Sequence, residues 1–155
     1  MKSSSQYSLN SGRDLTLDLQ DMEPPVSAIL RGEIESLARL IPTWCVDLRV
    51  RMVSLDDNTI GLASVSDEYR SALIEFDPYV LTLDRAQRLR IIAHELVHVI
   101  LQPLAGEAKR LADRMDGDGP QNSPTRTNVR RAVEMVTCDL ERAFLDAPRR
   151  TEATP

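Results

Sequence analysis

Residues 88–103, RLRIIAHELVHVILQP, contain both histidines of the chain. His94 and His98 are four residues apart, and Glu95 directly follows the first. On a helix, residues at i and i+4 lie one above the other on the same face, so both imidazoles can reach one cation. Glu95 is rotated by about 100° and is poorly placed as a ligand, but it can reach a water on the metal. The spacing predicts two metal ligands and a neighbouring general base, which metal-assisted hydrolysis requires.

The alternative is that these are polar residues on one face of an ordinary helix. The flanking segments, 91–93 and 96–100, add no further charge, which predicts a buried helix. Burying two imidazoles and a carboxylate among apolar side chains is costly unless something compensates them, and a cation does. We therefore favour the metal site.

Composition limits the classes of function. A length of 155 residues fits one domain, and a net charge of −5 gives no general attraction to nucleic acid or to an anionic membrane. Two cysteines, Cys45 and Cys138, make neither a zinc knuckle nor a disulfide framework. We find neither an apolar signal segment nor a run of 18 apolar residues, so we expect a cytoplasmic protein that does not engage a membrane.

The elements that position the motif follow from periodicity. An amphipathic helix is expected over 24–42, and alternating segments at 45–55, 59–66 and 69–76 predict a small, mainly antiparallel meander of three strands. The motif helix should run from 84 to 102, with Asp84 and Gln87 as a capping box and Pro103 stopping or kinking it. A short helix over 103–115 and a last helix over 129–147, capped by Asn128, complete the prediction.

This is an α+β arrangement: an N-terminal helix, a small sheet, the long motif helix and a C-terminal helix. We expect a single domain over 25–147, between a flexible polar tail at 1–24 and a second tail at 148–155.

The motif HELVH at 94–98, its long apolar helix and the preceding strands resemble the zincin metallopeptidases. The resemblance is to small gluzincin-type members: the minimal, the phage-associated and the IrrE/ImmA-like ones. It implies one Zn²⁺ per chain, with His94 and His98 as ligands and Glu95 as general base. It also implies a third ligand, a glutamate from a later helix. The cysteines of the related SprT-like DNA-associated proteases are absent, and no helix-turn-helix is evident.

For the third ligand the best candidate is Glu134, 36 residues after His98, because EMVTCDL resembles the family's pattern after its glutamate. Asp139 and Glu141 are runners-up. On a helical wheel Glu134 lies away from the middle of the apolar stripe, whereas Asp139 flanks it. Glu107 is expected to be solvated.

The function that we predict is hydrolysis of peptide bonds by a zinc metallopeptidase, with a peptide or protein substrate. If a strand borders the cleft, the one at 69–76 is favoured to pair with an extended peptide. Tyr69, Tyr79, Arg130 and Arg131 are conceivable donors to the oxyanion, and none is assigned. The alternatives are a catalytically inactive zincin-fold binding or regulatory module and a metal-free helical adaptor. Oligomeric state is not predicted.

Overall fold

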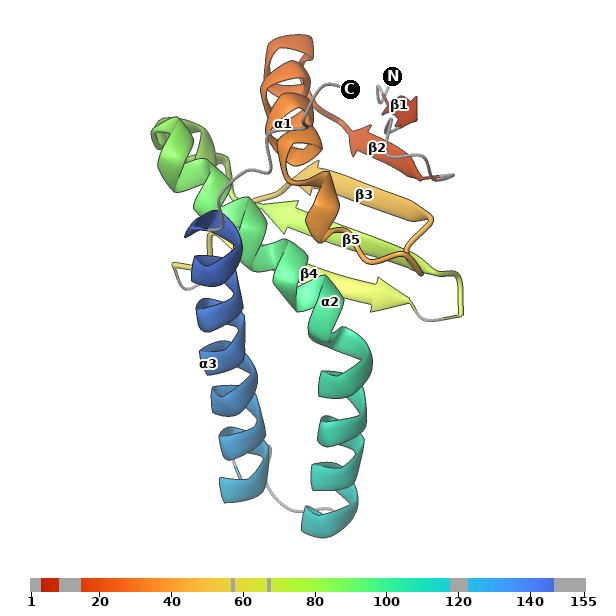
Figure 1. Ribbon diagram of the computed structural model, residues 1–155, viewed down its shortest axis with the longest axis vertical. Helices are drawn as coiled ribbons and strands as arrows, with labels where there is room; N and C mark the ends of the chain where they lie inside the picture. Colours follow the sequence, from red (N-terminus) through yellow and green to blue (C-terminus); the bar gives the residue numbers. More distant parts are fainter. Residues whose placement is uncertain (1–3, 9–14, 57, 67, 118–122, 147–155) are drawn as a thin grey trace, which may run out of the picture.

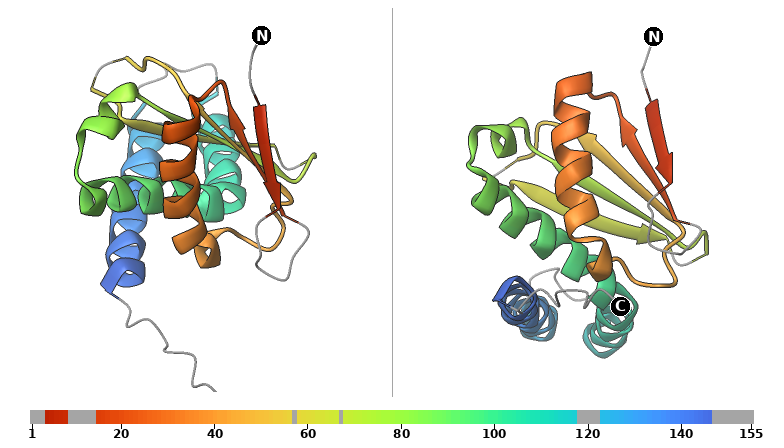
Figure 2. Two further views of the ribbon diagram at one scale, coloured as in Figure 1. Left: turned by 90° about the horizontal axis from the view of Figure 1, so that it is seen from above. Right: turned by 45° about the horizontal axis from the view of Figure 1, so that its top comes forward.

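The computed structural model describes residues 4–8, 15–56, 58–66, 68–117 and 123–146. It is of the α+β class, as predicted, and helices cover one face of a five-stranded sheet (Figures 1 and 2). The strands are β1 (Ser4–Ser8), β2 (Thr16–Gln20), β3 (Asp47–Met52), β4 (Gly61–Ser66) and β5 (Ser71–Phe76). The helices are α1 (Pro24–Ser36), α2 (Arg85–Asp116) and α3 (Pro124–Asp146), with short 3-10 helices η1 (Ala38–Leu40) and η2 (Pro78–Thr82).

The sheet is mixed, so the predicted antiparallel meander is wrong in its pairing. The strand order is β1-β2-β3-β5-β4, and β2, β3 and β5 are parallel, while β1 and β4 run antiparallel to their neighbours. The segments expected to be strands at 45–55, 59–66 and 69–76 do contain β3, β4 and β5. β5 lies between β3 and β4, so the segment 69–76 has no open edge; the outer strands of the sheet are β1 and β4, and β4 is the one next to β5.

The core lies between the sheet and the helices. Alternate residues of the strands point to this face and are fully or almost fully buried: Leu17, Leu19, Leu48, Val50, Ala72, Ile74 and Phe76. The opposite face is polar, with Arg51 of β3 donating to Glu75 of β5 at 2.8 Å from Nε to Oε1. The period of two therefore assigned the faces correctly.

The predicted tail at 1–24 is not a tail in the described structure. Leu15, Leu17 and Leu19 are at most 3% exposed, because β2 adds to β3 and buries this alternating trio. β1 then covers the outer edge of β2. The pattern LTLDL has the period of a strand, but because it lies in a polar segment it was assigned to the tail. The predicted tail at 148–155 lies outside the described residues.

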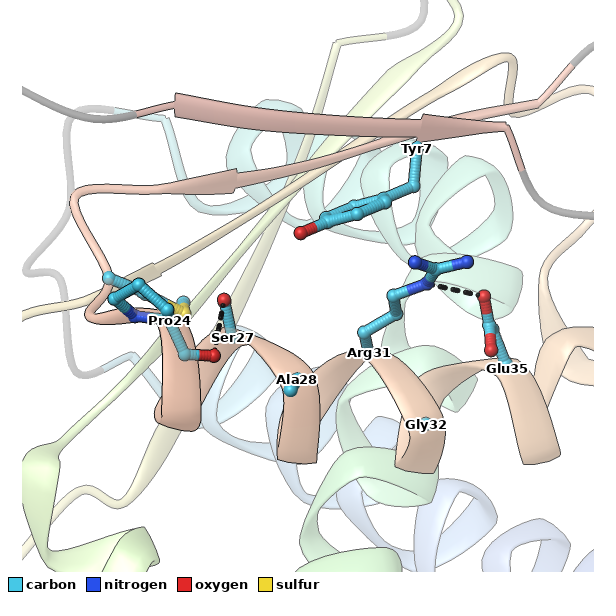
Figure 3. Close-up of a pocket in the computed structure, with 8 residues that line it drawn as sticks. Tyr7, Pro24, Ser27, Ala28, Arg31, Gly32 and Glu35 are labelled. Carbon is cyan, nitrogen blue, oxygen red and sulfur yellow. Dashed lines mark hydrogen bonds and ion pairs between the residues drawn. The ribbon is translucent and has the colours of Figure 1, made fainter.

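A small contact joins β1 to α1. The Arg31 guanidinium lies over the ring of Tyr7, 4.2 Å from its centroid, and its Nε donates to Glu35 Oε1 at 2.8 Å (Figure 3). These residues border a hollow of about 370 Å³. Because the cation is already engaged by the ring and the carboxylate, we assign this hollow no chemistry.

The motif helix α2 is longer than predicted. The capping box forms, since Asp84 Oδ1 accepts from the Gln87 N–H while the Gln87 side chain accepts from the Asp84 N–H. The helix continues through Pro103 to Asp116 and changes direction partway along (Figure 1). A proline inside a helix removes one hydrogen bond without ending the helix where packing continues. The first half of α2 lies on the sheet, and the second half extends beyond it beside α3 (Figures 1 and 2).

α3 begins earlier than predicted. Its first residue is Pro124, and Ser123 precedes it, accepting from the Arg126 N–H at 3.3 Å. Proline is favoured at the first helical position, so this start is physically reasonable. Asn128 therefore lies inside the helix, and its predicted role as N-cap is wrong. Among the described helices, none combines the length and apolar character needed to cross a lipid bilayer.

Candidate metal centre

The two histidines and the favoured glutamate meet between α2 and α3. His94 Nε2 lies 3.1 Å from His98 Nε2. The Glu134 carboxylate faces both rings, with Oε2 3.6 Å from His94 Nε2 and Oε1 3.5 Å from His98 Nε2. The i, i+4 spacing on α2 thus presents two nitrogens to a carboxylate from a helix that begins 26 residues after His98.

These separations can be tested against a metal. Three atoms bound at about 2.0–2.1 Å to a tetrahedral ion stand roughly 3.3 Å apart. The two imidazole nitrogens are 3.1 Å apart, and each lies 3.5 or 3.6 Å from a different oxygen of the Glu134 carboxylate, so each separation is close to that value. The donor set of two imidazoles and one carboxylate also suits zinc. The three residues therefore fit a zinc ion without rearrangement of the helices.

Glu141 orients the ring of His94 from the side opposite Glu134. Its carboxylate is 3% exposed, and Oε2 lies 3.0 Å from His94 Nδ1. Arg90 Nε donates to the other oxygen at 2.6 Å. A carboxylate at Nδ1 accepts a hydrogen bond from the Nδ1–H group, which keeps the proton on Nδ1 and leaves the Nε2 lone pair free to bind a cation. The runner-up Glu141 thus lies close to the candidate ligands but on the far side of the imidazole from Glu134.

Cys138 adds a second group of potential ligands. Its sulfur lies within 4.8 Å of ligand atoms of His94 and Glu141. The Glu141 oxygens already accept hydrogen bonds from His94 and Arg90. We therefore interpret this second group of residues as holding the His94 ring in place, and not as a second metal site.

His98 has weaker support. Thr137 of α3, fully buried, places Oγ1 3.5 Å from His98 Nδ1. Burial lowers the pKa of His98, and the nearby Glu134 carboxylate opposes that shift in part. The neutral ring, which is the form that binds metals, is therefore favoured.

Glu95 lies on the side of α2 that faces β4. It is 5% exposed, and burial raises its pKa to about 7, with a smaller rise from Glu134, while His94 and a backbone hydrogen bond from Ala63 act in the opposite direction. A carboxylate with a pKa near 7 is well matched to take and release a proton at neutral pH.

Room for this carboxylate comes from a glycine. A Cβ atom on Gly61, the first residue of β4, would lie 2.6 Å from Glu95 Oε1 and 2.9 Å from both Cδ and Cγ. Sequence reasoning missed Gly61, although a glycine in a strand pattern often marks a close approach.

The other acidic candidates lie elsewhere. The runner-up Asp139 has a side chain 78% exposed and 3.7 Å from Arg142 Nη1. Glu107 is also exposed and pairs with Arg110, as expected of a solvated residue. The helical-wheel argument was misleading, because the two buried residues of α3 are Thr137 and Glu141.

The buried residues of α3 are therefore polar, and its apolar stripe is only partly covered. Val136 of the stripe is 46% exposed, whereas Val129 and Val133 are half-buried and line a hollow shared with α2. The useful signal was that residues 134, 137 or 138, and 141 recur on one helical face.

A cavity of about 430 Å³ opens beside the centre, between the second half of α2, α3 and the start of β4. His98, Glu134 and Leu62 line it, together with Arg130 among others. The Glu134 side chain is 51% exposed, so a cation held there would be open to solvent and substrate. Of the four side chains considered as oxyanion donors, only Arg130 lines this cavity.

Comparison with known proteins gives no match: no family model, no curated protein and no solved structure is similar to this chain at a significant level. The chemistry of the centre is accordingly inferred from its own residues. Two imidazole nitrogens, one open carboxylate and one buried acid define a candidate mononuclear metal centre.

Proposed function

We propose that the protein is a zinc metallopeptidase of the zincin type, holding one Zn²⁺ per chain. The observation that carries the proposal is the meeting of His94, His98 and Glu134 at separations that match the edge of a tetrahedral zinc site. Of the predicted acids, Glu134 is the one that lies within reach of both Nε2 atoms, which supports it as third ligand over Asp139.

The chain's own residues supply the remaining roles. When bound, Zn²⁺ supplies a Lewis acid that lowers the pKa of water and polarises a carbonyl. Glu95, buried and held by the Ala63 N–H, accepts the proton of the attacking water and returns it to the leaving amine. Glu141 keeps His94 in the tautomer that binds metal.

A peptide substrate is favoured by the strand beside the centre. Asp77 N donates to the Ile60 carbonyl, so along β4 the alternate residues Gly61, Ala63 and Val65 direct their backbone groups away from β5. The Ala63 N–H is taken by Glu95, and an extended peptide could pair with the other outward-facing backbone groups of this edge, which runs past Glu95. β4 therefore replaces the segment 69–76 as the proposed substrate strand.

The test measures zinc content and hydrolysis together. Purified untagged protein should contain about one zinc per chain and should cleave peptides from a degenerate pool. Glu95→Gln should keep the metal and lose hydrolysis, whereas His94→Ala should lose both. Undiminished hydrolysis in zinc-loaded Glu95→Gln would refute the assigned base.

A catalytically inactive zincin-fold module is the second candidate. It is favoured by one observation: Tyr69 and Tyr79, which were considered as hydroxyl donors to the oxyanion without being assigned, are 69% and 55% exposed and do not line the cavity. This candidate predicts bound zinc without turnover. A protein free of zinc at saturating Zn²⁺ would instead support the metal-free adaptor.

A further inference from the structure

The cavity beside the metal centre carries an excess of positive charge. Lys109, Arg126 and Arg130 line it, against a single acid, Glu134, which the proposed function assigns to the metal. This is the reverse of the chain as a whole, whose net charge is −5. The excess therefore belongs to the cavity and is not a general property of the surface.

Two of these cations have no acidic partner in the part of the chain that the structure describes. Arg126 is engaged, because its Nε donates to Asp113 Oδ1 at 2.7 Å. Among the described residues, no ion pair joins Lys109 or Arg130 to a carboxylate, although the neighbouring Arg110 and Arg142 are paired with acids of their own helices. Lys109 from α2 and Arg130 from α3 thus offer charge to the same cavity from opposite walls.

The two cations lie at different distances from the centre: Lys109 follows His98 by eleven residues, or about 16 Å along α2, and Arg130 is closer. Arg130 precedes Glu134 by four residues, which is one helical turn, or about 6 Å along α3. Along the two helices, the lining between the cations and the metal centre includes the apolar Ala105 and Val133 and the uncharged Gln102, and Leu62 of β4 adds a further apolar side chain to the cavity. The short aliphatic part of a substrate group can pack against such a wall, and a negative charge at the end of that group then meets the cations.

We propose that this cavity selects a carboxylate on the substrate, close to the bond that is cleaved, through Lys109 and Arg130. This inference rests on the proposed peptidase function, whose substrate class it narrows. The carboxylate belongs either to an acidic side chain or to the end of a peptide. Both sources have the same chemistry, and the peptides used in the test separate them.

The test measures binding and cleavage separately. Three degenerate octapeptide pools are mixed with the zinc-loaded protein: an amidated pool with glutamate at one fixed position, the same pool with glutamine there, and the glutamine pool with a free carboxyl terminus. Fluorescence anisotropy gives the apparent Kd of each. One of the two carboxylate pools should bind about two- to tenfold more tightly than the amidated glutamine pool. The ratio of these two Kd values, the Kd of the glutamine pool divided by that of the carboxylate pool, should shrink in high salt.

Charge reversal assigns the preference to its residues. In Lys109→Glu and in Arg130→Glu the ratio should fall towards one, and the double variant should abolish or invert it. Arg131→Glu is the matched control, because Arg131 is the next residue on α3, is exposed and does not line the cavity; its ratio should stay that of the wild type.

Equal binding of all three pools, or a preference that the double variant retains, would overturn the inference. Cleavage is followed on the same mixtures by mass spectrometry. Absence of cleavage with a preserved carboxylate preference would overturn the peptidase proposal while supporting a carboxylate-binding cavity. Cleavage without any carboxylate preference would support the peptidase proposal and overturn the carboxylate-binding cavity.

Discussion

Replacing Gly61 with alanine tests whether the place of the Glu95 carboxylate matters. The added Cβ would lie 2.6 Å from Oε1 and 2.9 Å from Cδ and Cγ of that carboxylate. Ordinary contacts between carbon atoms are about 3.5–4.0 Å, so the carboxyl group must retreat by roughly 0.6–1 Å. The atoms in conflict form the end of a side chain, which can rotate, and the strand itself need not move.

The expected result separates activity from stability. Displacing a catalytic group by about 1 Å costs on the order of a hundredfold in rate, and we expect that loss in kcat/KM. Overpacking costs about 1–3 kcal/mol, which the lower chain entropy of alanine partly offsets, so unfolding free energy should fall by about 0–2 kcal/mol. Zinc content should stay near one, because the three atoms nearest to the added methyl group all belong to Glu95 and none belongs to a proposed ligand.

Three measurements on one preparation check this: metal analysis, urea unfolding and hydrolysis of a peptide that the wild type cleaves. Gly32→Ala in α1 is the matched control, since a Cβ there meets nothing within 4 Å. It should keep full activity and gain up to about 1 kcal/mol of stability. A Gly61→Ala protein with wild-type zinc and more than half of wild-type kcat/KM would refute the role assigned to Glu95 in its observed position.

Two further predictions concern the buried acids. The pKa of Glu95 is about 7 in the fold and near 4.5 when unfolded, so its contribution to stability is present below pH 4.5 and is lost as pH rises through 7. Metal-free Glu95→Gln should therefore gain on the order of 2–3 kcal/mol over metal-free wild type between pH 5 and pH 8 in urea unfolding, and a difference independent of pH would contradict this. Glu141→Gln should weaken zinc binding about 10- to 100-fold in competition with a chelating dye. Asp139→Asn, on the exposed face of the same helix, should leave the zinc affinity unchanged. Equal zinc affinities of the two variants would contradict the role assigned to Glu141.

Several features could be predicted from the sequence because each depends on residues that are close together in the chain. The capping box at Asp84, the alternation of Leu48 and Val50, and the four-residue spacing of the histidines each depend on neighbours within one helical turn or one strand. The trio Leu15, Leu17 and Leu19 carried the same kind of signal but lay in a polar segment. Its burial became evident only when β2 was seen paired with β3.

The pairing of strands and helices was beyond the sequence. Whether β3 pairs with β4 or with β5 depends on how the intervening chain crosses, and both choices satisfy the same alternation. The face of α3 that packs on α2 was misjudged for a similar reason. A helix usually buries its apolar stripe most deeply, but here the fully buried residues are the polar Thr137 and Glu141, while stripe residues such as Val133 and Phe144 are half-buried.

By itself the sequence determined the α+β class, the helix that carries the motif, and the pairing of His94 with His98 on one face, since backbone periodicity fixes these within a few residues. The tertiary structure decided that Glu134 and not Asp139 faces the imidazoles, that β4 and not β5 is an outer strand of the sheet, and that Gly61 admits the Glu95 carboxylate. Each of these depends on which surfaces meet between segments distant in the chain, and no local pattern encodes that meeting.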